Sequence, residues 1–284
     1  MSPKKSLRES FKLMRGAAPL LVSVPHSGSL IPDELHAHFR DEALGSQDTD
    51  WFMEELYGAI VKRLGGSMIS PLFSRYVIDL NRPENDESLY PGQTTTGLCP
   101  TQRFDGAPLY HNGKIPDLVE RERRIELYWR PYHHALQAEL DRLLSLYGVV
   151  LLWEGHSIKS IVPRLFEGQL TDLNLGTNDG KSCDPLLEKT LIASLDQIEV
   201  STQTKAYSSV LNGRFKGGYI TRNYGLPHRG VNAIQLELSQ RVYLADEDHP
   251  SWDPRHASGI SELIESLISK CLETLMSDLR PSLL

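Results

Sequence analysis

Short apolar runs alternate with amphipathic segments along most of this 284-residue chain. The runs "PLLVSVP", "VVLLW" and "AIQLEL" end at Pro25, Trp153 and Leu238, and helix-like segments lie between them. Strands that alternate with helices favour a largely parallel sheet with helices on both faces. Because no Gly-, Ser- or Pro-rich linker divides the chain, we expect residues 1–284 to form one α/β domain.

The apolar spacing locates the helices. In residues 50–66, Phe52, Leu56 and Ile60 fall on one helical face, and Gly65 ends the segment. Residues 115–148 are expected to form a long helix or a helix pair that Pro131 kinks or breaks. We also expect helices over 184–197 and 260–279, one or two strands within 67–83 with 76–80 the clearest, and strands over 217–225 and 232–240.

Two long segments are rich in polar and turn-forming residues. They cover residues 83–112 and 157–186, and both are predicted to be loops. Long loops in compact domains are often functional, so closure over a substrate is one use for them.

Composition excludes several classes of protein. The formal net charge is −7, which argues against a nucleic-acid binder. No apolar run approaches 18 residues, and no apolar stretch follows the charged first residues, so we expect neither a membrane span nor a secretory signal. Cys99, Cys183 and Cys271 are widely spaced, which suits reduced thiols in the cytoplasm. The oligomeric state is not predicted.

Polar side chains stand where apolar runs end, although burial of such groups costs free energy unless they are paired. In α/β sheets, ligands bind beyond the carboxyl ends of the strands, so these distant groups are expected to meet there. Two histidines and one carboxylate with an open position form a catalytic zinc site, and a second carboxylate can serve as the base. The candidates are His26, Asp48, Asp50, Asp79, Glu154, His156 and Glu237.

Each candidate also has a plainer interpretation. A lone histidine after a strand is more often a hydrogen-bonded structural residue. Asp48 or Asp50 would suit the N-cap of the following helix, and Glu237 would suit an exposed strand position. His133 and His134 in "YHHAL" are interpreted as surface or packing residues. The sequence has no HExxH, P-loop, GxGxxG or GxSxG motif to support zincin, nucleotide, dinucleotide or serine-hydrolase chemistry.

Basic residues interleaved with glycine suggest anion recognition. The segment "SRYVIDLNR" supplies Arg75 and Arg82, and "NGRFKGGYITR" supplies Arg214, Lys216 and Arg222. Guanidinium groups match carboxylates bidentately, so a small dicarboxylate is a suitable ligand. A solvated hairpin with ordinary surface charge is the alternative for the second segment.

Several segments together resemble the N-formylglutamate amidohydrolase family. They are "VPHSG", "DTDW", "SRYVIDLNRP", "EGHSIKS", "PRLFEG", "DLNLGTNDGKSC", "NGRFKGGYITRNYG" and "AIQLELSQ", in order between Pro19 and Glu247. The resemblance implies a mixed α/β sheet of phosphorylase/hydrolase type, similar to zinc carboxypeptidases. It also implies a divalent metal, Zn²⁺, and hydrolysis of N-formyl-L-glutamate to L-glutamate and formate. That reaction is the last step of one histidine degradation route.

The resemblance also implies roles for individual residues. His26 and His156 look like imidazole ligands, and Asp50 like the carboxylate ligand, with Asp48 as the alternative. Zinc carboxypeptidases use a short HxxE spacing, whereas position 29 here is Ser29, so the acidic ligand comes from further along the chain. The remaining roles are Glu237 as general base, Glu154 as a catalytic or His156-orienting carboxylate, Asp79 as the partner of an arginine, and Arg75, Asn81, Arg82, Asn212, Arg214 and Arg222 as substrate-binding residues.

Two other functions remain open from the sequence. A related metal-dependent N-acyl amino acid amidohydrolase or peptidase would use the same metal arrangement, because fold does not fix substrate. A non-catalytic protein that binds an acidic amino acid derivative would need the arginines but no metal. A base beside a metal site argues against the second alternative.

Overall fold

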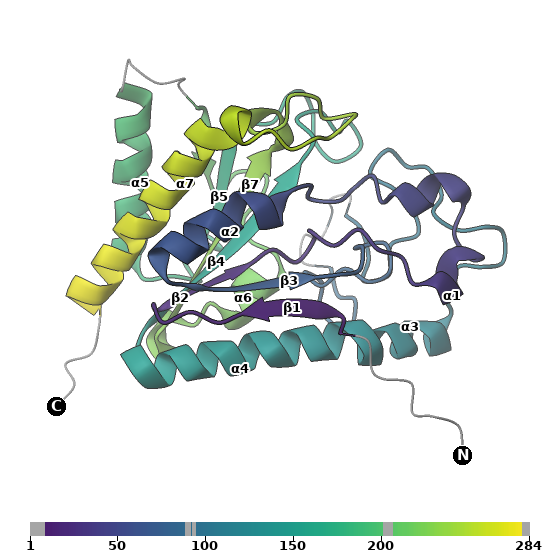
Figure 1. The fold of residues 1–284 in the computed structure, drawn as a ribbon, viewed down its shortest axis with the longest axis horizontal. Coiled ribbons are helices and arrows are strands. Elements are labelled where there is room, and N and C mark those ends of the chain that lie inside the picture. Colours follow the sequence, from purple (N-terminus) through teal and green to yellow (C-terminus); the bar gives the residue numbers. More distant parts are fainter. Residues whose placement is uncertain (1–8, 89–91, 93–94, 201–206, 280–284) are drawn as a thin grey trace.

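A seven-stranded mixed sheet forms the centre of the molecule (Figure 1). The structure is a computed structural model that describes residues 9–88, 92, 95–200 and 207–279. The strand order is β1-β3-β2-β4-β7-β5-β6. The strands are β1 (Phe11–Met14), β2 (Leu20–Ser23), β3 (Ser67–Pro71), β4 (Val150–Ile158), β5 (Leu173–Gly176), β6 (Ser209–Leu211) and β7 (Val231–Ser239).

The central part of this sheet is parallel. Strands β3, β2, β4 and β7 pair in parallel, whereas β1 pairs antiparallel with β3, and β5 pairs antiparallel with β7. Parallel strands need crossover connections, and the helices supply them. The predicted α/β class, with a mixed and largely parallel sheet flanked by helices, is confirmed.

Helices cover both faces of the sheet. In Figure 1, α2, α5 and α7 lie on one side of it and α4 lies on the other. The helices are α1 (Asp33–His36), α2 (Met53–Leu64), α3 (Leu118–Arg124), α4 (Arg130–Tyr147), α5 (Pro185–Val200), α6 (Tyr219–Tyr224) and α7 (Pro254–Thr274). In the part of the chain that the structure describes, no helix is both long and apolar enough to cross a bilayer.

The two faces of β4 supply two separate hydrophobic cores. Leu151 and Trp153 pack with the α2 and α7 side, whereas Val150 and Leu152 pack with the α4 side. This division follows from the alternation of side chains along a strand. Because β4 is buried on both faces, its first four residues, Val150–Trp153, form a continuous apolar run rather than an alternating one.

Two predicted strands are wrong. Residues 76–80 form buried turns, and the strand of that region is β3, which ends at Pro71. The apolar side chains of 76–80 do enter a core, so burial without sheet pairing produced the same pattern. Residues 217–225 contain the short helix α6 instead of a strand. Its buried residues Ile220, Thr221 and Tyr224 face the interior at helical spacing, so tertiary packing overrides their β-propensity.

The two predicted loops differ in outcome. Residues 157–186 are not wholly irregular, because β5 occupies Leu173–Gly176 and pairs with β7. A strand of four residues is too short to give a clear alternation. The described part of 83–112 holds no named helix or strand and is irregular, as predicted.

The predicted helix around Pro131 continues past the proline with a local change of form. A π-helical turn, Ile125–Trp129, joins α3 to α4, and Pro131 lies in the first turn of α4. Proline has no N–H to bond the preceding turn, so a wider turn before it is a way to keep the helix intact. The prediction at 50–66 is confirmed at its end, where Gly65 caps α2 with a φ of 69°.

Candidate active site

Three side chains from separate elements meet at the carboxyl end of the parallel strands. His26 follows β2, Asp50 precedes α2, and His156 lies in β4. One candidate ligand atom from each lies within 4.8 Å of the others, and all three residues are buried. The backbone N–H of Asp50 donates to the His26 carbonyl at 3.1 Å, which ties the first two segments together. The predicted meeting of distant polar groups therefore occurs.

Each imidazole has a carboxylate on its Nε2 atom. Asp79 Oδ1 lies 2.6 Å from His26 Nε2, and Glu154 Oε1 lies 2.8 Å from His156 Nε2. A carboxylate in this position holds the ring proton on Nε2 and leaves the other nitrogen as the ligand atom. The Nδ1 atoms of His156 and His26 accordingly face Asp50 Oδ2, at 3.1 and 3.8 Å.

The residues present fit a divalent transition metal. Asp50 Oδ1 is buried and has no hydrogen-bond partner among the described residues, although such atoms are nearly always satisfied in folded proteins. Two imidazole nitrogens and a carboxylate oxygen are the ligand types of catalytic zinc sites. In this structure His156 Nδ1 lies 3.1 Å from Asp50 Oδ2, and His26 Nδ1 lies 3.2 Å from Arg75 Nη1. A bound cation would satisfy the unpartnered Asp50 oxygen and would replace these contacts of the two Nδ1 atoms.

Asp48 is not in this cluster. Its carboxylate accepts the backbone N–H of Phe104 at 2.7 Å, and burial raises its pKa. Neither Asp48 nor Asp50 caps α2, so the N-cap interpretation is wrong: the N-cap is Phe52, without a side-chain cap. Phe52 has a φ of 58°, an uncommon conformation for a bulky residue, in the turn that follows Asp50.

Glu237 lies beside the cluster on the neighbouring strand. In the parallel pairing of β4 and β7, His156 is opposite Glu237 and Glu154 is opposite Gln235. Glu237 is only 8% exposed, so its interpretation as a surface residue is wrong. Burial raises the pKa of Glu237 to about 8, and the charge of His156 limits the rise. A buried carboxylate with a raised pKa is a suitable proton acceptor.

The charges around the cluster act in opposite directions on the two imidazoles. Burial and then the Arg75 guanidinium lower the pKa of His26. Burial also disfavours charge on His156, but Glu154 and Asp50 outweigh it and raise its pKa. For Asp79, burial is outweighed by His26 and Arg75, so its pKa lies well below the usual value. The surroundings therefore disfavour the charged form of His26 and favour the charged form of His156.

Four of the predicted substrate-binding residues line the cavity at the cluster. Arg75 and Asn81 come from the turn that carries Asp79, Arg82 follows them, and Arg214 reaches in from the segment after β6. Arg75 also donates to Asp79 Oδ2 at 2.7 Å and lies over the ring of Phe104. Other lining residues are His26, Asp79, Thr95, Thr96, Phe104, His156, Ser157, Ile158, Leu165, Phe215, Gly218, Gln235 and Glu237.

Three predicted residues have other positions. Asn212 and Arg222 are not among the described residues that line the cavity. The Asn212 side chain accepts the backbone N–H groups of Thr177 and Asp179, and Arg222 donates to the carbonyl of Gly217. Glu154 is fully buried behind His156, which leaves it an orienting position rather than contact with a substrate.

Several site residues were missed by sequence reasoning. The second oxygen of Glu154 accepts the backbone N–H and the hydroxyl of Thr221 in α6. Gln235 accepts the Gly218 N–H at 2.7 Å and lines the cavity. Its position two residues before Glu237 places both on one face of β7, and this spacing was a usable signal. Phe104 and Thr221 carried no comparable signal.

Comparisons with known proteins identify the family of this chain. The family model for N-formylglutamate amidohydrolase matches residues 18–244. The chain therefore belongs to the N-formylglutamate amidohydrolase family, as the resemblance predicted.

Individual relatives are similar over most of their length. A Pseudomonas aeruginosa N-formylglutamate deformylase is 46% identical over 268 residues, covering 94% of this chain and 96% of that protein. A Pseudomonas putida N-formylglutamate deformylase is 47% identical over 234 residues, covering 82% of this chain and 85% of that protein. The crystal structure of a Ralstonia eutropha N-formylglutamate amidohydrolase has a TM-score of 0.76 at 26% identity, covering 94% and 98% of the two chains.

Proposed function

We propose that this protein hydrolyses N-formyl-L-glutamate to L-glutamate and formate with a bound divalent metal, Zn²⁺. The observation that carries the proposal is the buried group His26, Asp50 and His156 beside Glu237, in a chain whose relatives are named as deformylases. The reaction would be the last step of a histidine degradation route in the cytoplasm.

His26 Nδ1, His156 Nδ1 and one oxygen of Asp50 would hold the metal. The ion would supply Lewis acidity, which acidifies water and polarises a carbonyl group. Asp79 and Glu154 hold the two rings in the orientation and tautomer that binding requires. Neither carboxylate then needs to touch the substrate.

Glu237 is the proton carrier in this proposal. Its carboxylate accepts a proton from the water that attacks the formyl carbon. The proton then passes to the amide nitrogen as the C–N bond breaks, so that glutamate leaves as the amine and the formyl group as formate. The burial that raises the pKa of Glu237 to about 8 makes it a stronger base than an exposed carboxylate.

The cations that line the cavity suit a substrate with two carboxylates. Arg75 lines this cavity, and its Nη1 lies 3.9 Å from Asp50 Oδ1, which supports a role in stabilising negative charge on the reacting oxygen. Arg82 and Arg214 line the same cavity and would bind the substrate carboxylates, with Asn81 adding a hydrogen bond. The positive charges of the arginines and the negative charges of the substrate carboxylates would then fix the orientation of the substrate in the cavity.

The first test is formate release from N-formyl-L-glutamate by purified protein, before and after treatment with a chelator and after zinc is added back. Metal-dependent release is the expected result. Activity that survives complete metal removal would contradict the metal site. A metal-loaded protein without formate release would contradict the substrate.

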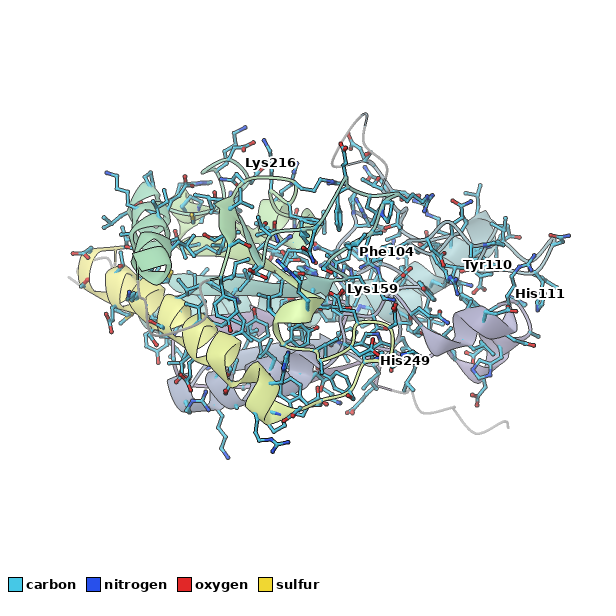
Figure 2. The ribbon with its side chains drawn as sticks, turned by 90° about the horizontal axis from the view of Figure 1, so that it is seen from above. Phe104, Tyr110, His111, Lys159, Lys216 and His249 are labelled. Atoms are coloured by element: carbon cyan, nitrogen blue, oxygen red, sulfur yellow. The ribbon has the colours of Figure 1, made fainter. Side chains whose placement is uncertain are left out.

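A second cavity favours one alternative, a related N-acyl amino acid amidohydrolase. This cavity has a volume of about 640 Å³ and shares Phe104, Ser157 and Ile158 with the wall of the first. Lys159 also lines it, and Figure 2 shows Phe104 and Lys159 near each other. Such space beside the site would suit an acyl group longer than formyl. Comparison of kcat/KM for N-formyl-, N-acetyl- and N-succinyl-L-glutamate separates the two functions.

A further inference from the structure

Three consecutive backbone carbonyls near the active site are each held by a hydrogen bond from another element. His133 Nε2 lies 2.9 Å from the Leu80 carbonyl, and Trp129 Nε1 donates to the Arg82 carbonyl at 2.9 Å. Between them, the backbone N–H of Tyr219 donates to the Asn81 carbonyl at 3.3 Å. Residues 80–82 lie in a turn, so no helix or sheet satisfies these carbonyls.

Trp129 and His133 form part of an aromatic group, which we call the aromatic clamp and which also includes the buried Tyr224 and the half-buried Tyr219. The rings of Trp129 and His133 have centroids 3.8 Å apart, and the ring of Tyr224 is stacked parallel to that of His133. His133 Nδ1 lies 2.9 Å from the Tyr224 hydroxyl. Neighbours on both sides of the His133 ring therefore fix the plane of the ring and the directions in which its two nitrogen atoms point.

The protonation state of His133 suits a fixed donor. The residue is 3% exposed, and burial lowers its pKa to about 3. A neutral imidazole has one donor and one acceptor nitrogen. The Leu80 carbonyl can only accept, so Nε2 carries the proton, and Nδ1 accepts from the hydroxyl of Tyr224.

The π-helical turn sets the position of both donors. Trp129 is the last residue of that turn, and His133 lies four residues later in α4. Residues at this spacing share one helical face, so both side chains point at the turn 80–82. Wide turns of this kind are frequently found at functional sites.

The turn held by the clamp presents two residues of the cavity wall. Asn81 and Arg82 both line the cavity, and the Asn81 side-chain oxygen accepts the N–H of Ile220 at 2.9 Å. A change in the backbone of 80–82 would move both side chains relative to the metal-binding group. An apolar side chain at 133 would fill the same space without a donor for Leu80.

We propose that His133 is a positioning residue for substrate binding, which acts with Trp129 by fixing the turn 80–82. The inference rests on the proposed function, because Asn81 and Arg82 are assigned there to substrate recognition. His133 is neither a member of the metal-binding group nor one of the described residues that line the cavity. Its removal should therefore act on KM more than on kcat.

The test compares His133→Leu with His133→Gln. Leucine removes the donor, and KM should rise about tenfold with kcat changed by less than a factor of about three. Glutamine keeps an amide donor and an acceptor, so it should restore much of the affinity. Trp129→Phe removes the second donor while keeping a ring, and should raise KM in the same direction. His134→Gln, an exposed neighbour, is the matched control.

Hydrogen exchange gives a readout that does not depend on the substrate. Amides of the 79–82 segment should exchange faster in His133→Leu and Trp129→Phe, and exchange should slow again in His133→Gln. Unchanged exchange in both donor-free variants would overturn the inference, as would an unchanged KM in active variants. If the wild-type protein releases no formate but exchange is still faster in the two donor-free variants, the proposed function would be overturned and the clamp would be supported.

Discussion

Asp79 Oδ1 lies 2.6 Å from His26 Nε2, while the other oxygen of the same carboxylate accepts from Arg75 at 2.7 Å. One buried side chain therefore joins a metal-ligand candidate to the cation nearest the cluster. A third contact, from the backbone N–H of Asn81 at 2.9 Å, fixes the carboxylate itself. The sequence prediction gave Asp79 an arginine partner and missed the histidine.

Replacement of Asp79 by asparagine should weaken metal binding by about 10- to 100-fold. The amide cannot hold the His26 proton on Nε2 as a carboxylate does, so the ligand nitrogen becomes less basic and less well oriented. Competition with a chelator at equilibrium measures the effect. Asp105→Asn changes an exposed carboxylate and serves as the control. Equal metal affinity in the two variants would remove Asp79 from the support of the site.

The choice between Asp50 and Asp48 can be tested directly. Asp50→Asn should lose metal from the purified protein, because Asp50 Oδ2 lies 3.8 and 3.1 Å from the Nδ1 atoms of His26 and His156. Asp48→Asn should keep its metal, since that carboxylate bonds the N–H of Phe104. Metal analysis of both proteins after dialysis gives the answer. Retention by the first variant and loss by the second would reverse the assignment.

Glu237→Gln should reduce kcat by about 10²- to 10⁴-fold and leave the metal content intact. The amide has nearly the same shape but cannot accept the proton of the attacking water. Formate release and metal content are measured on the same preparation. If zinc is lost together with activity, Glu237 is a ligand and the base must be sought elsewhere.

Arg214→Ala should raise KM for N-formyl-L-glutamate by about tenfold or more with a smaller change in kcat, because a charge-assisted hydrogen bond to the substrate is lost. Lys216→Ala is the comparison, since Lys216 pairs with Asp179 away from the cavity lining. Steady-state kinetics of both variants provide the measurement. An unchanged KM in Arg214→Ala would exclude this guanidinium from substrate recognition.

His133 should make the protein less stable in mild acid. Its pKa is lowered to about 3 in the folded protein, whereas an unfolded histidine titrates near about 6.5, so below that pH the unfolded chain binds more protons. Stability is then present above pH ~6.5 and is lost progressively as the pH falls towards about 3. The loss between pH ~6.5 and ~5 is about 2 kcal/mol.

Urea unfolding of the wild type and of His133→Gln over this pH range isolates the contribution of the imidazole. The difference in unfolding free energy between the two proteins should shrink as the pH falls, because glutamine does not titrate. A difference that stays constant with pH would show that His133 titrates normally.

The meeting of the central site residues was predictable because it follows from strand ends. His26, His156 and Glu237 stand beside apolar runs, and the carboxyl ends of parallel strands converge. The choice of Asp50 over Asp48 was not fixed, because both residues precede the same helix. In the structure the Asp50 carboxylate faces His156, whereas the Asp48 carboxylate accepts the N–H of Phe104.

The outer parts of the site were less predictable. The run 76–80 was interpreted as a strand because its side chains are apolar. The sequence therefore did not predict the turn 80–82, whose carbonyls accept hydrogen bonds from side chains of the helical segment 125–147. Asn212 and Arg222 were grouped with Arg214 on their closeness in sequence. The left-handed turn at Asn212 and the helix α6 direct their side chains elsewhere, and neither feature has a periodic signal.

The register of β4 and β7 has a further consequence. His156 and Glu237 are directly paired residues on adjacent strands, so the spacing of the sheet itself sets the separation of the proposed metal ligand and the proposed base. That spacing is common to all sheets and does not vary with the surrounding loops. Insertions or deletions in the loops can therefore alter which substrate is accepted without changing the separation of His156 and Glu237 on which the proposed proton transfer depends. A slip of one residue between the strands would instead abolish it, because both side chains would no longer share a face.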